Sequence, residues 1–168
     1  MRVTSSGVEN GVILDRFGGR GTEFNENQIP TRSLPFQVWE APEHTKSFAL
    51  VLEDKDAYPV TGGFVWIHWL AADITRWELL ENESRTAKDF VQGANSWMSS
   101  QGGEQSRELS SFYGGMTPPD KDHLYELHVF ALDTILGLSQ GFYLNELYHA
   151  MENHILDSFT LKGIYKKL

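Results

Sequence analysis

The stretch Phe64-Val65-Trp66-Ile67-His68-Trp69-Leu70 decides the fold, because it is aromatic and β-branched with one polar side chain, His68. A strand covered on both faces has this composition, whereas a half-exposed strand alternates apolar and polar residues. The stretch therefore predicts a central strand, and its histidine needs a partner inside the protein. A structural histidine satisfied by a carboxylate or a carbonyl is one explanation of His68, and a functional histidine is the other.

Further strands are expected on both sides of this stretch. The apolar run from Phe48 to Leu52 turns acidic at Asp54 and Asp56, which indicates a buried strand that ends in a loop. Residues 123 to 132 return to strand character, and the alternation of apolar and polar residues from 158 to 165 predicts a final half-buried strand.

Three other regions have a different character. Residues 144 to 156 predict a helix, with one apolar face formed by Leu144, Leu147, Tyr148, Met151 and Ile155. Residues 1 to 35 carry scattered Gly, Asn and Pro, and indicate a loop-rich entry to the fold. Residues 82 to 117 are rich in Ser, Gly, Gln, Glu and Arg, and predict a long surface excursion that buries little.

Composition sets the class of protein. A chain of 168 residues suits one compact domain, so we expect a single domain over residues 1–168. The five Trp, six Tyr, ten Phe and fifteen Gly favour strands joined by tight turns over a helical bundle, and predict a mostly β fold.

Several function classes are excluded by charge and residue usage. The net charge of −9 with fourteen Lys plus Arg argues against nucleic-acid binding. The absence of cysteine excludes disulfides, thiolate nucleophiles and sulfur-ligated zinc, and no glycine-rich phosphate loop or dinucleotide motif is present. We expect no cofactor, and no metal either, because the stretch after Asp54 lacks the glycine and glutamate of a calcium loop and His149 and His154 are five positions apart.

Apolar runs bear on location. The longest, Phe64 to Ala72, is far too short to span a membrane, and the start of the sequence carries no apolar leader. The expectation is a cytoplasmic protein without a transmembrane segment.

Candidate site residues gather near the ends of the expected strands. His123 and Tyr125 project to one face of a strand because side chains alternate in direction, and Asp54 and Asp56 share a side if the chain stays extended. The turn Tyr113-Gly114-Gly115-Met116-Thr117-Pro118-Pro119 comes shortly before His123. Paired glycines let the backbone approach a ligand and paired prolines stiffen the chain, although both pairs also occur in ordinary loops.

Four stretches together resemble the phosphatidylethanolamine-binding protein family, in particular its bacterial Raf-kinase-inhibitor-like branch. Each motif alone is modest, but the set follows the family's order from about Phe36 to the C-terminus. The stretches are Asp54-Lys55-Asp56-Ala57-Tyr58-Pro59, similar to the first signature Asp-Pro-Asp-Ala-Pro; Trp66-Ile67-His68-Trp69; Tyr113-Gly114-Gly115 followed by Pro118-Pro119 and His123-Leu124-Tyr125; and His154-Ile155-Leu156 with Gly163-Ile164-Tyr165.

The resemblance implies a large antiparallel sheet packed on a smaller sheet, with a few peripheral helices and a small pocket at one end. In the family this pocket takes phosphate-like or carboxylate groups, and the bacterial branch makes a homodimer plausible. The ligand-binding residues carried over to this sequence are Asp54, Asp56, His68, Pro118, Pro119, His123 and Tyr125. Imidazole N–H and phenol O–H groups can donate hydrogen bonds to an oxyanion, with Asp54 orienting a histidine.

The sequence departs from the family pattern at four places. Lys55 replaces a proline, Tyr58 is inserted before Pro59, and Leu124 stands where arginine is common. The insertion from Asn95 to Ser111 is longer than expected, and could cover the pocket or form a partner surface. The first two departures leave undecided where Asp54 lies relative to the pocket.

Three functions remain open at this stage. The favoured hypothesis is a non-catalytic binding or regulatory protein that recognises a small anionic ligand or a phosphorylated protein partner. The alternative is a hydrolase or lyase acting on a small phospho- or acyl compound, with His68 or His123 as general base and Asp54 orienting it. The sequence shows no activated nucleophile for such an enzyme. It therefore assigns no residue a specific catalytic role. The third hypothesis is an interaction module with a vestigial pocket.

Overall fold

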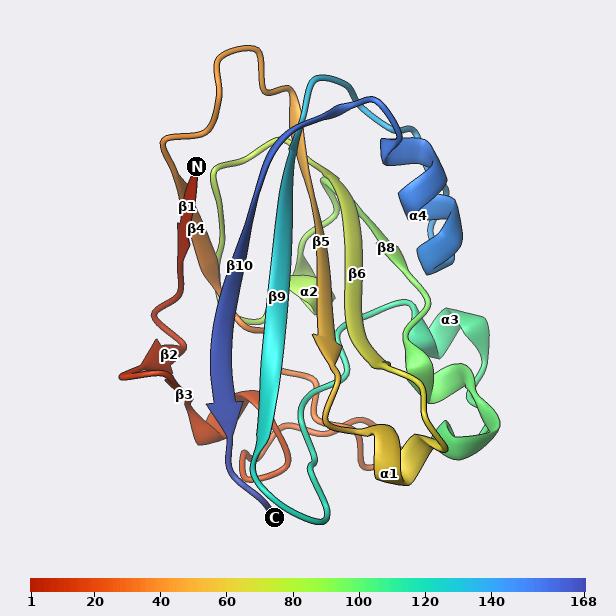
Figure 1. The fold of residues 1–168 in the computed structure, drawn as a ribbon. Coiled ribbons are helices and arrows are strands. Elements are labelled where there is room, and N and C mark those ends of the chain that lie inside the picture. Colours follow the sequence, from red (N-terminus) through yellow and green to blue (C-terminus); the bar gives the residue numbers. More distant parts are fainter.

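A computed structural model describes residues 1–168, which form two β-sheets and several short helices (Figure 1). The larger, seven-stranded sheet has the order β2 (Val8–Glu9), β3 (Val12–Ile13), β10 (Ile155–Tyr165), β9 (His123–Leu132), β5 (Ser47–Asp54), β6 (Trp66–Ile74) and β8 (Val91–Gly93). The three-stranded sheet has the order β1 (Arg2–Thr4), β4 (Phe36–Trp39) and β7 (Glu78–Leu79). The helices are η1 (Asp15–Phe17), α1 (Tyr58–Thr61), α2 (Glu83–Thr86), η2 (Ser96–Met98), η3 (Ser100–Gly102), α3 (Arg107–Ser110) and α4 (Leu144–Met151).

The topology confirms the mostly β prediction of a large sheet packed on a smaller one with peripheral helices. Strands β10, β9, β5, β6 and β8 pair antiparallel throughout. The pair β10 and β3 is parallel, so the larger sheet is not purely antiparallel. This departure arises because the short β2–β3 hairpin adds to the edge of the sheet beside the last strand.

Two apolar cores lie on opposite faces of the larger sheet. One fills the space between the sheets and includes Val38 of β4, Leu50 of β5 and Val129 of β9. The other lies under α4 and includes Val51 and Leu147. Strand β5 is therefore covered on both faces along most of its length, which explains why its apolar run does not alternate.

Strand β6 confirms the prediction of a covered strand, because Trp69 and Leu70, which belong to opposite cores, are fully buried. It begins at Trp66, however, and not at Phe64. Phe64 is held in the turn that follows α1, where it exchanges hydrogen bonds of 2.6 and 3.2 Å with the hydroxyl of Thr61. The first two residues of the apolar stretch are consequently exposed, and they lie outside the sheet.

The predicted C-terminal helix starts at Leu144 but ends at Met151, earlier than expected. Asn153 has a left-handed φ of 65°, which ends the helix and turns the chain into β10. Ile155 is therefore an exposed strand residue, and Tyr148 is also exposed, so the predicted apolar face is wrong at these two positions. Leu147 and Met151 are buried as predicted.

Residues 82 to 117 were wrongly predicted to stay on the surface. They include β8, which extends the larger sheet, and the fully buried Tyr113. Gln92 is buried too, because its Oε1 accepts hydrogen bonds from Trp69 Nε1 at 2.7 Å and from the Ser84 hydroxyl at 2.6 Å. Polar side chains can enter a core when they satisfy one another, and composition alone does not reveal this.

One end of the larger sheet gathers most of the short helices. Strand β5 ends there and β6 and β9 begin there, and α1 and α3 lie at the same end (Figure 1). No helix in the structure has the length and apolar character needed to cross a membrane.

Candidate functional site

Strand register places three residues side by side, in one row across three neighbouring strands, at this end of the sheet. Asp54 of β5 pairs with Trp66 of β6 on one side and with Tyr125 of β9 on the other. The register between β5 and β6 shifts next to this row, because Leu52 pairs with Trp69 while the following residue pairs with Ile67. His68 is the additional residue of this β-bulge. Bulges re-aim side chains beside functional sites, and this one turns His68 toward the row.

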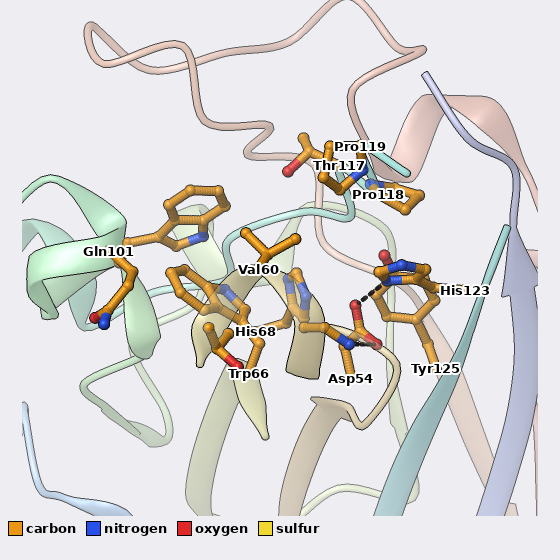
Figure 2. A pocket seen from close by; sticks show the side chains of 13 residues that line it. Asp54, Val60, Trp66, His68, Gln101, Thr117, Pro118, Pro119, His123 and Tyr125 are labelled. Carbon is orange, nitrogen blue, oxygen red and sulfur yellow. Dashed lines mark hydrogen bonds and ion pairs between the residues drawn. The ribbon is translucent and has the colours of Figure 1, made fainter. Parts of the chain in front are cut away.

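A pocket of about 110 Å³ lies at this row (Figure 2). Six of the seven residues predicted to bind a ligand line it, from segments that are distant in sequence. The complete lining is Asp54, Ala57, Val60, Thr61, Trp66, His68, Trp97, Gln101, Thr117, Pro118, Pro119, His123 and Tyr125. In Figure 2 the two prolines lie at the rim, Trp66 and Gln101 on one side, and His123 and Tyr125 on the other.

Asp54 organises the polar side of the pocket. Its Oδ1 accepts hydrogen bonds from the backbone N–H of Asp56 at 2.8 Å and of Ala57 at 3.1 Å, which holds the turn into α1. Its Oδ2 accepts a hydrogen bond of 2.7 Å from Nδ1 of His123. Asp54 is buried, so all three donors stabilise its charge in the absence of water. This contact fixes the orientation of the His123 ring.

His123 lies between two carboxylates. Its second ring nitrogen, Nε2, is 2.8 Å from Oδ1 of Asp120, a residue that sequence reasoning missed. Burial lowers the pKa of His123, but the hydrogen bonds to Asp54 and Asp120 outweigh it and leave the pKa raised. Because a carboxylate only accepts, both nitrogens donate and the ring is an imidazolium. The N–H expected to meet a ligand therefore already has a partner in this structure.

His68 has a different state. Its Nδ1 lies 2.6 Å from the carbonyl oxygen of Gly114, and the N–H of Gly114 donates to the His68 carbonyl at 2.9 Å. Burial lowers the pKa of His68, while Asp54 and the carbonyls of Gly114 and Gly115 act in the opposite direction. His68 is therefore neutral at pH 7, with its proton on Nδ1.

Three buried donors at the pocket have no hydrogen-bond partner: the hydroxyl of Tyr125 and the indole nitrogens of Trp66 and Trp97. Tyr125 is 1% exposed and Trp66 is 7% exposed, so bulk water does not reach these donors to form the missing hydrogen bonds. Burial raises the pKa of the Tyr125 phenol far above its ordinary value, which keeps it protonated. An unpaired buried donor is costly and is uncommon in native proteins. All three belong to residues that line the same pocket.

The Asn95 to Ser111 insertion forms one wall of the pocket. Trp97 packs edge-on against Trp66, with ring centroids 5.0 Å apart and planes at 77°. The hydroxyl of Ser96 accepts the Ile67 N–H at 2.8 Å, which ties the insertion to β6. Gly114 allows this packing, since a Cβ there would lie 2.3 Å from the Trp97 indole nitrogen. The long departure from the family pattern therefore forms part of the pocket wall.

Asp56 is the predicted residue that does not line the pocket. The chain turns after Asp54, so the two carboxylates do not stay on one side as an extended chain would require. Asp56 accepts the Leu124 N–H at 3.0 Å and the Lys121 ammonium at 3.2 Å. The hydrogen bond from the Leu124 N–H is the main cause of the lowered pKa of Asp56, and the Lys121 ammonium adds to it. It links α1 to the start of β9 from outside the pocket.

A second carboxylate and histidine cluster lies on the opposite face of the same two strands. Glu53, Glu126 and His128 present ligand atoms within 4.8 Å of one another, which is a spacing that a metal ion could use. Both carboxylates already have cationic partners, however. Lys55 lies 2.5 Å from Glu126 and 3.2 Å from Glu53, and Lys162 lies 2.8 Å from Glu126. A metal ion would have to displace two ammonium groups, so this cluster is an ion-pair network.

Comparison with known proteins gives the family. The family model described as phosphatidylethanolamine-binding protein matches residues 4–166. The chain belongs to this family. The Bacillus subtilis (strain 168) protein YxkA, described as uncharacterized, is 47% identical over 157 residues, which cover 91% of this chain and 93% of YxkA. A UPF0098 protein of Methanothermobacter thermautotrophicus is 33% identical over 158 residues, covering 90% of this chain and 91% of that protein.

Solved structures agree with the fold. The phosphatidylethanolamine-binding protein homologue CT736 of Chlamydia trachomatis superposes with a TM-score of 0.79 at 27% identity, covering 99% of this chain and 97% of its own. E. coli YbcL, described as a new member of the mammalian family, has the same fold with a TM-score of 0.75 at 23% identity, covering 99% and 98%. The family prediction is confirmed, whereas the Raf-kinase-inhibitor-like branch, the homodimer and the cytoplasmic location stay predictions.

Proposed function

We propose that this member of the phosphatidylethanolamine-binding family binds a small phosphate- or carboxylate-bearing ligand without converting it. The observation that carries the proposal is the pocket with three buried donors that lack an acceptor, the Tyr125 hydroxyl and the Trp66 and Trp97 indoles. Oxygen atoms of an oxyanion are strong acceptors, and hydrogen bonds to charged acceptors are the stronger kind.

The size of the pocket limits the ligand. Its volume of about 110 Å³ is small beside the ~300–1,000 Å³ of pockets that enclose drug-sized molecules. One tetrahedral or planar oxyanion with few further atoms suits such a space. The same headgroup can belong to a free metabolite or to a phosphorylated residue of a protein partner, and both remain within the proposal.

A hydrolase or lyase finds less support in the geometry. His123 donates both ring protons to carboxylates and has no lone pair with which to act as a base. His68 keeps a lone pair, but its lowered pKa makes it a weak base. Among the lining hydroxyls, that of Thr61 already donates to the Phe64 carbonyl. A binding role therefore fits these side chains better than a catalytic one.

Tyr125→Phe tests the proposal with little risk to the fold, because the hydroxyl that it removes lies near Asp54 without a well-formed hydrogen bond. Isothermal titration with inorganic phosphate should show affinity about tenfold weaker than in the unaltered protein, which is the loss of one strong hydrogen bond. Denaturant unfolding should be nearly unchanged.

Tyr165→Phe is the matched control. The Tyr165 hydroxyl accepts the Arg20 N–H at 2.9 Å and donates to the Asp15 carbonyl at 2.7 Å, outside the pocket. This variant should lose stability and keep its phosphate affinity. If phosphate, acetate and phosphomonoesters all fail to bind the unaltered protein, the pocket is vestigial and the proposal is wrong.

A further inference from the structure

We propose that the pocket selects oxyanions that carry a proton, such as inorganic phosphate and arsenate, over oxyanions of similar size that carry none, because His68 Nε2 presents a lone pair to the ligand. This inference rests on the proposed function, since it names the class of anion that the same pocket takes. It assigns to His68 the role of a specificity-determining acceptor.

The tautomer of His68 follows from its partner. The carbonyl oxygen of Gly114 can only accept, so the nitrogen 2.6 Å away, Nδ1, must carry the hydrogen. The N–H of Gly114 returns a 2.9 Å hydrogen bond to the His68 carbonyl, and this pair of bonds fixes the ring. In the neutral ring the remaining nitrogen, Nε2, has a lone pair and no hydrogen.

The surroundings of His68 keep the ring neutral. It is 3% exposed, and burial is the main influence that lowers its pKa. The imidazolium of His123 acts in the same direction, because a second positive charge nearby is unfavourable. Asp54 favours protonation, but its carboxylate already accepts three hydrogen bonds from other groups.

No protein donor meets Nε2. The nearest aromatic neighbour, Tyr125, has its ring centroid 5.3 Å from that of His68, yet its hydroxyl makes no hydrogen bond. The pocket therefore combines one acceptor without a protein partner, His68 Nε2, with several buried donors. A ligand that satisfies all of them must accept hydrogen bonds and also donate one.

The charges around His123 also favour an anion that carries a proton. Asp54 and Asp120 flank the imidazolium of His123, so the three groups together carry one negative charge. An anion with a proton can point it at a lone pair or a carboxylate, whereas an anion without one meets only repulsion there. Phosphate and arsenate keep at least one proton at neutral pH, whereas sulfate and selenate are fully deprotonated.

The experiment compares these four anions as inorganic salts at pH 7 and constant ionic strength, by isothermal titration of the unaltered protein. Arsenate is larger than phosphate, and selenate is larger than sulfate. Each protonation class therefore contains a smaller and a larger anion, which separates the effect of the proton from the effect of size. We expect phosphate and arsenate to bind at least about tenfold more tightly than sulfate and selenate, the effect of one unsatisfied buried acceptor.

The outcomes are distinct. If sulfate binds within about twofold of phosphate, the inference about His68 is wrong and the proposed function stands. If none of the four anions binds, and acetate does not bind either, the proposed function itself fails.

Two further measurements concern His68 directly. Nitrogen-15 NMR of the free protein should show the neutral tautomer with hydrogen on Nδ1, and a protonated Nε2 would overturn the inference. His68→Gln places an amide that can rotate to donate, so it should reduce the preference for phosphate over sulfate to about twofold or less. His128→Gln, on the opposite face of the sheet, is the matched control and should keep the preference.

Discussion

Two histidines on β9 each face carboxylates of β5, but they lie on opposite faces of the same pair of strands. His123 contacts Asp54 beside the pocket, whereas His128 contacts Glu53 at 3.1 Å on the outer face. The outer cluster includes two lysines that balance its carboxylates, and the inner cluster has no lysine bound to Asp54. Adjacent residues in sequence thus build a charge-balanced network on one face and a candidate site on the other.

The difference shows that a hydrogen-bonded pair of histidine and carboxylate does not by itself indicate a binding site. Such pairs occur on both faces, but the inner pair adjoins a pocket whose donors lack partners. The outer pair is partly open to water and every charge in it has a counterion. Unfilled hydrogen-bonding capacity beside an enclosed space distinguishes the two.

The largest expected effect comes from removing the inner carboxylate. Asp54→Ala leaves the N–H groups of Asp56 and Ala57 and the ring of His123 without their acceptor. We expect a loss of about 3–5 kcal/mol in the free energy of unfolding, measured with urea, as for other buried charge pairs. Glu53→Ala on the outer face should cost about 1 kcal/mol or less. Equal losses would remove the distinction between the two clusters.

A smaller effect is expected from closing the inner space. Gly114→Ala introduces a Cβ that lies 2.3 Å from the Trp97 indole nitrogen, so the indole must move. Overpacking of this kind costs about 1–3 kcal/mol, and the displaced wall should weaken phosphate binding. Unfolding in urea and phosphate titration measure the two effects. Unchanged affinity would show that Trp97 is not part of the binding surface.

Acid should weaken the outer cluster by a smaller amount. Lys162 and Lys55 lower the pKa of Glu126 from 4.5 to about 2. Its contribution to stability is present above pH 4.5 and is lost as the pH falls toward 2. We expect Lys162→Met to reduce this acid-induced fall in Tm, with Lys88→Met, at an exposed loop position away from the cluster, as control. The same fall in all three proteins would contradict this assignment.

The smallest effect is expected from the inner cluster as the pH rises above 6.5. The pKa of His123 is raised above 6.5 in the folded protein, because Asp54 and Asp120 outweigh the effect of burial. Its protonated ring stabilises the fold fully below pH 6.5, and this contribution is lost as the pH rises through the raised pKa. Asp120→Asn should move this loss to lower pH, as followed by the NMR titration of His123. A titration that Asp120→Asn leaves unmoved would contradict the contact.

Sequence patterns predicted the sheet, and six of the residues taken from the ordered motifs line the pocket, because both features follow strand periodicity and motif order. They missed the bulge at His68, which depends on register between two strands rather than on either strand alone. They missed Asp120 because a carboxylate in a polar loop has no periodic signal, and its contact with His123 appears only once β9 is placed. The aromatic wall from Trp97 was also unforeseen, since a Ser- and Gly-rich composition gives no sign of it.

The 2.7 Å contact between Asp54 and His123 joins residues 69 positions apart, and the wall at Trp97 comes from a third segment. Contacts of such sequence separation form late and slowly, because closure of long loops costs entropy before it gains contacts. The pocket therefore exists only in chains that have finished folding. An anion that occupies it should slow unfolding and leave the rate of folding unchanged.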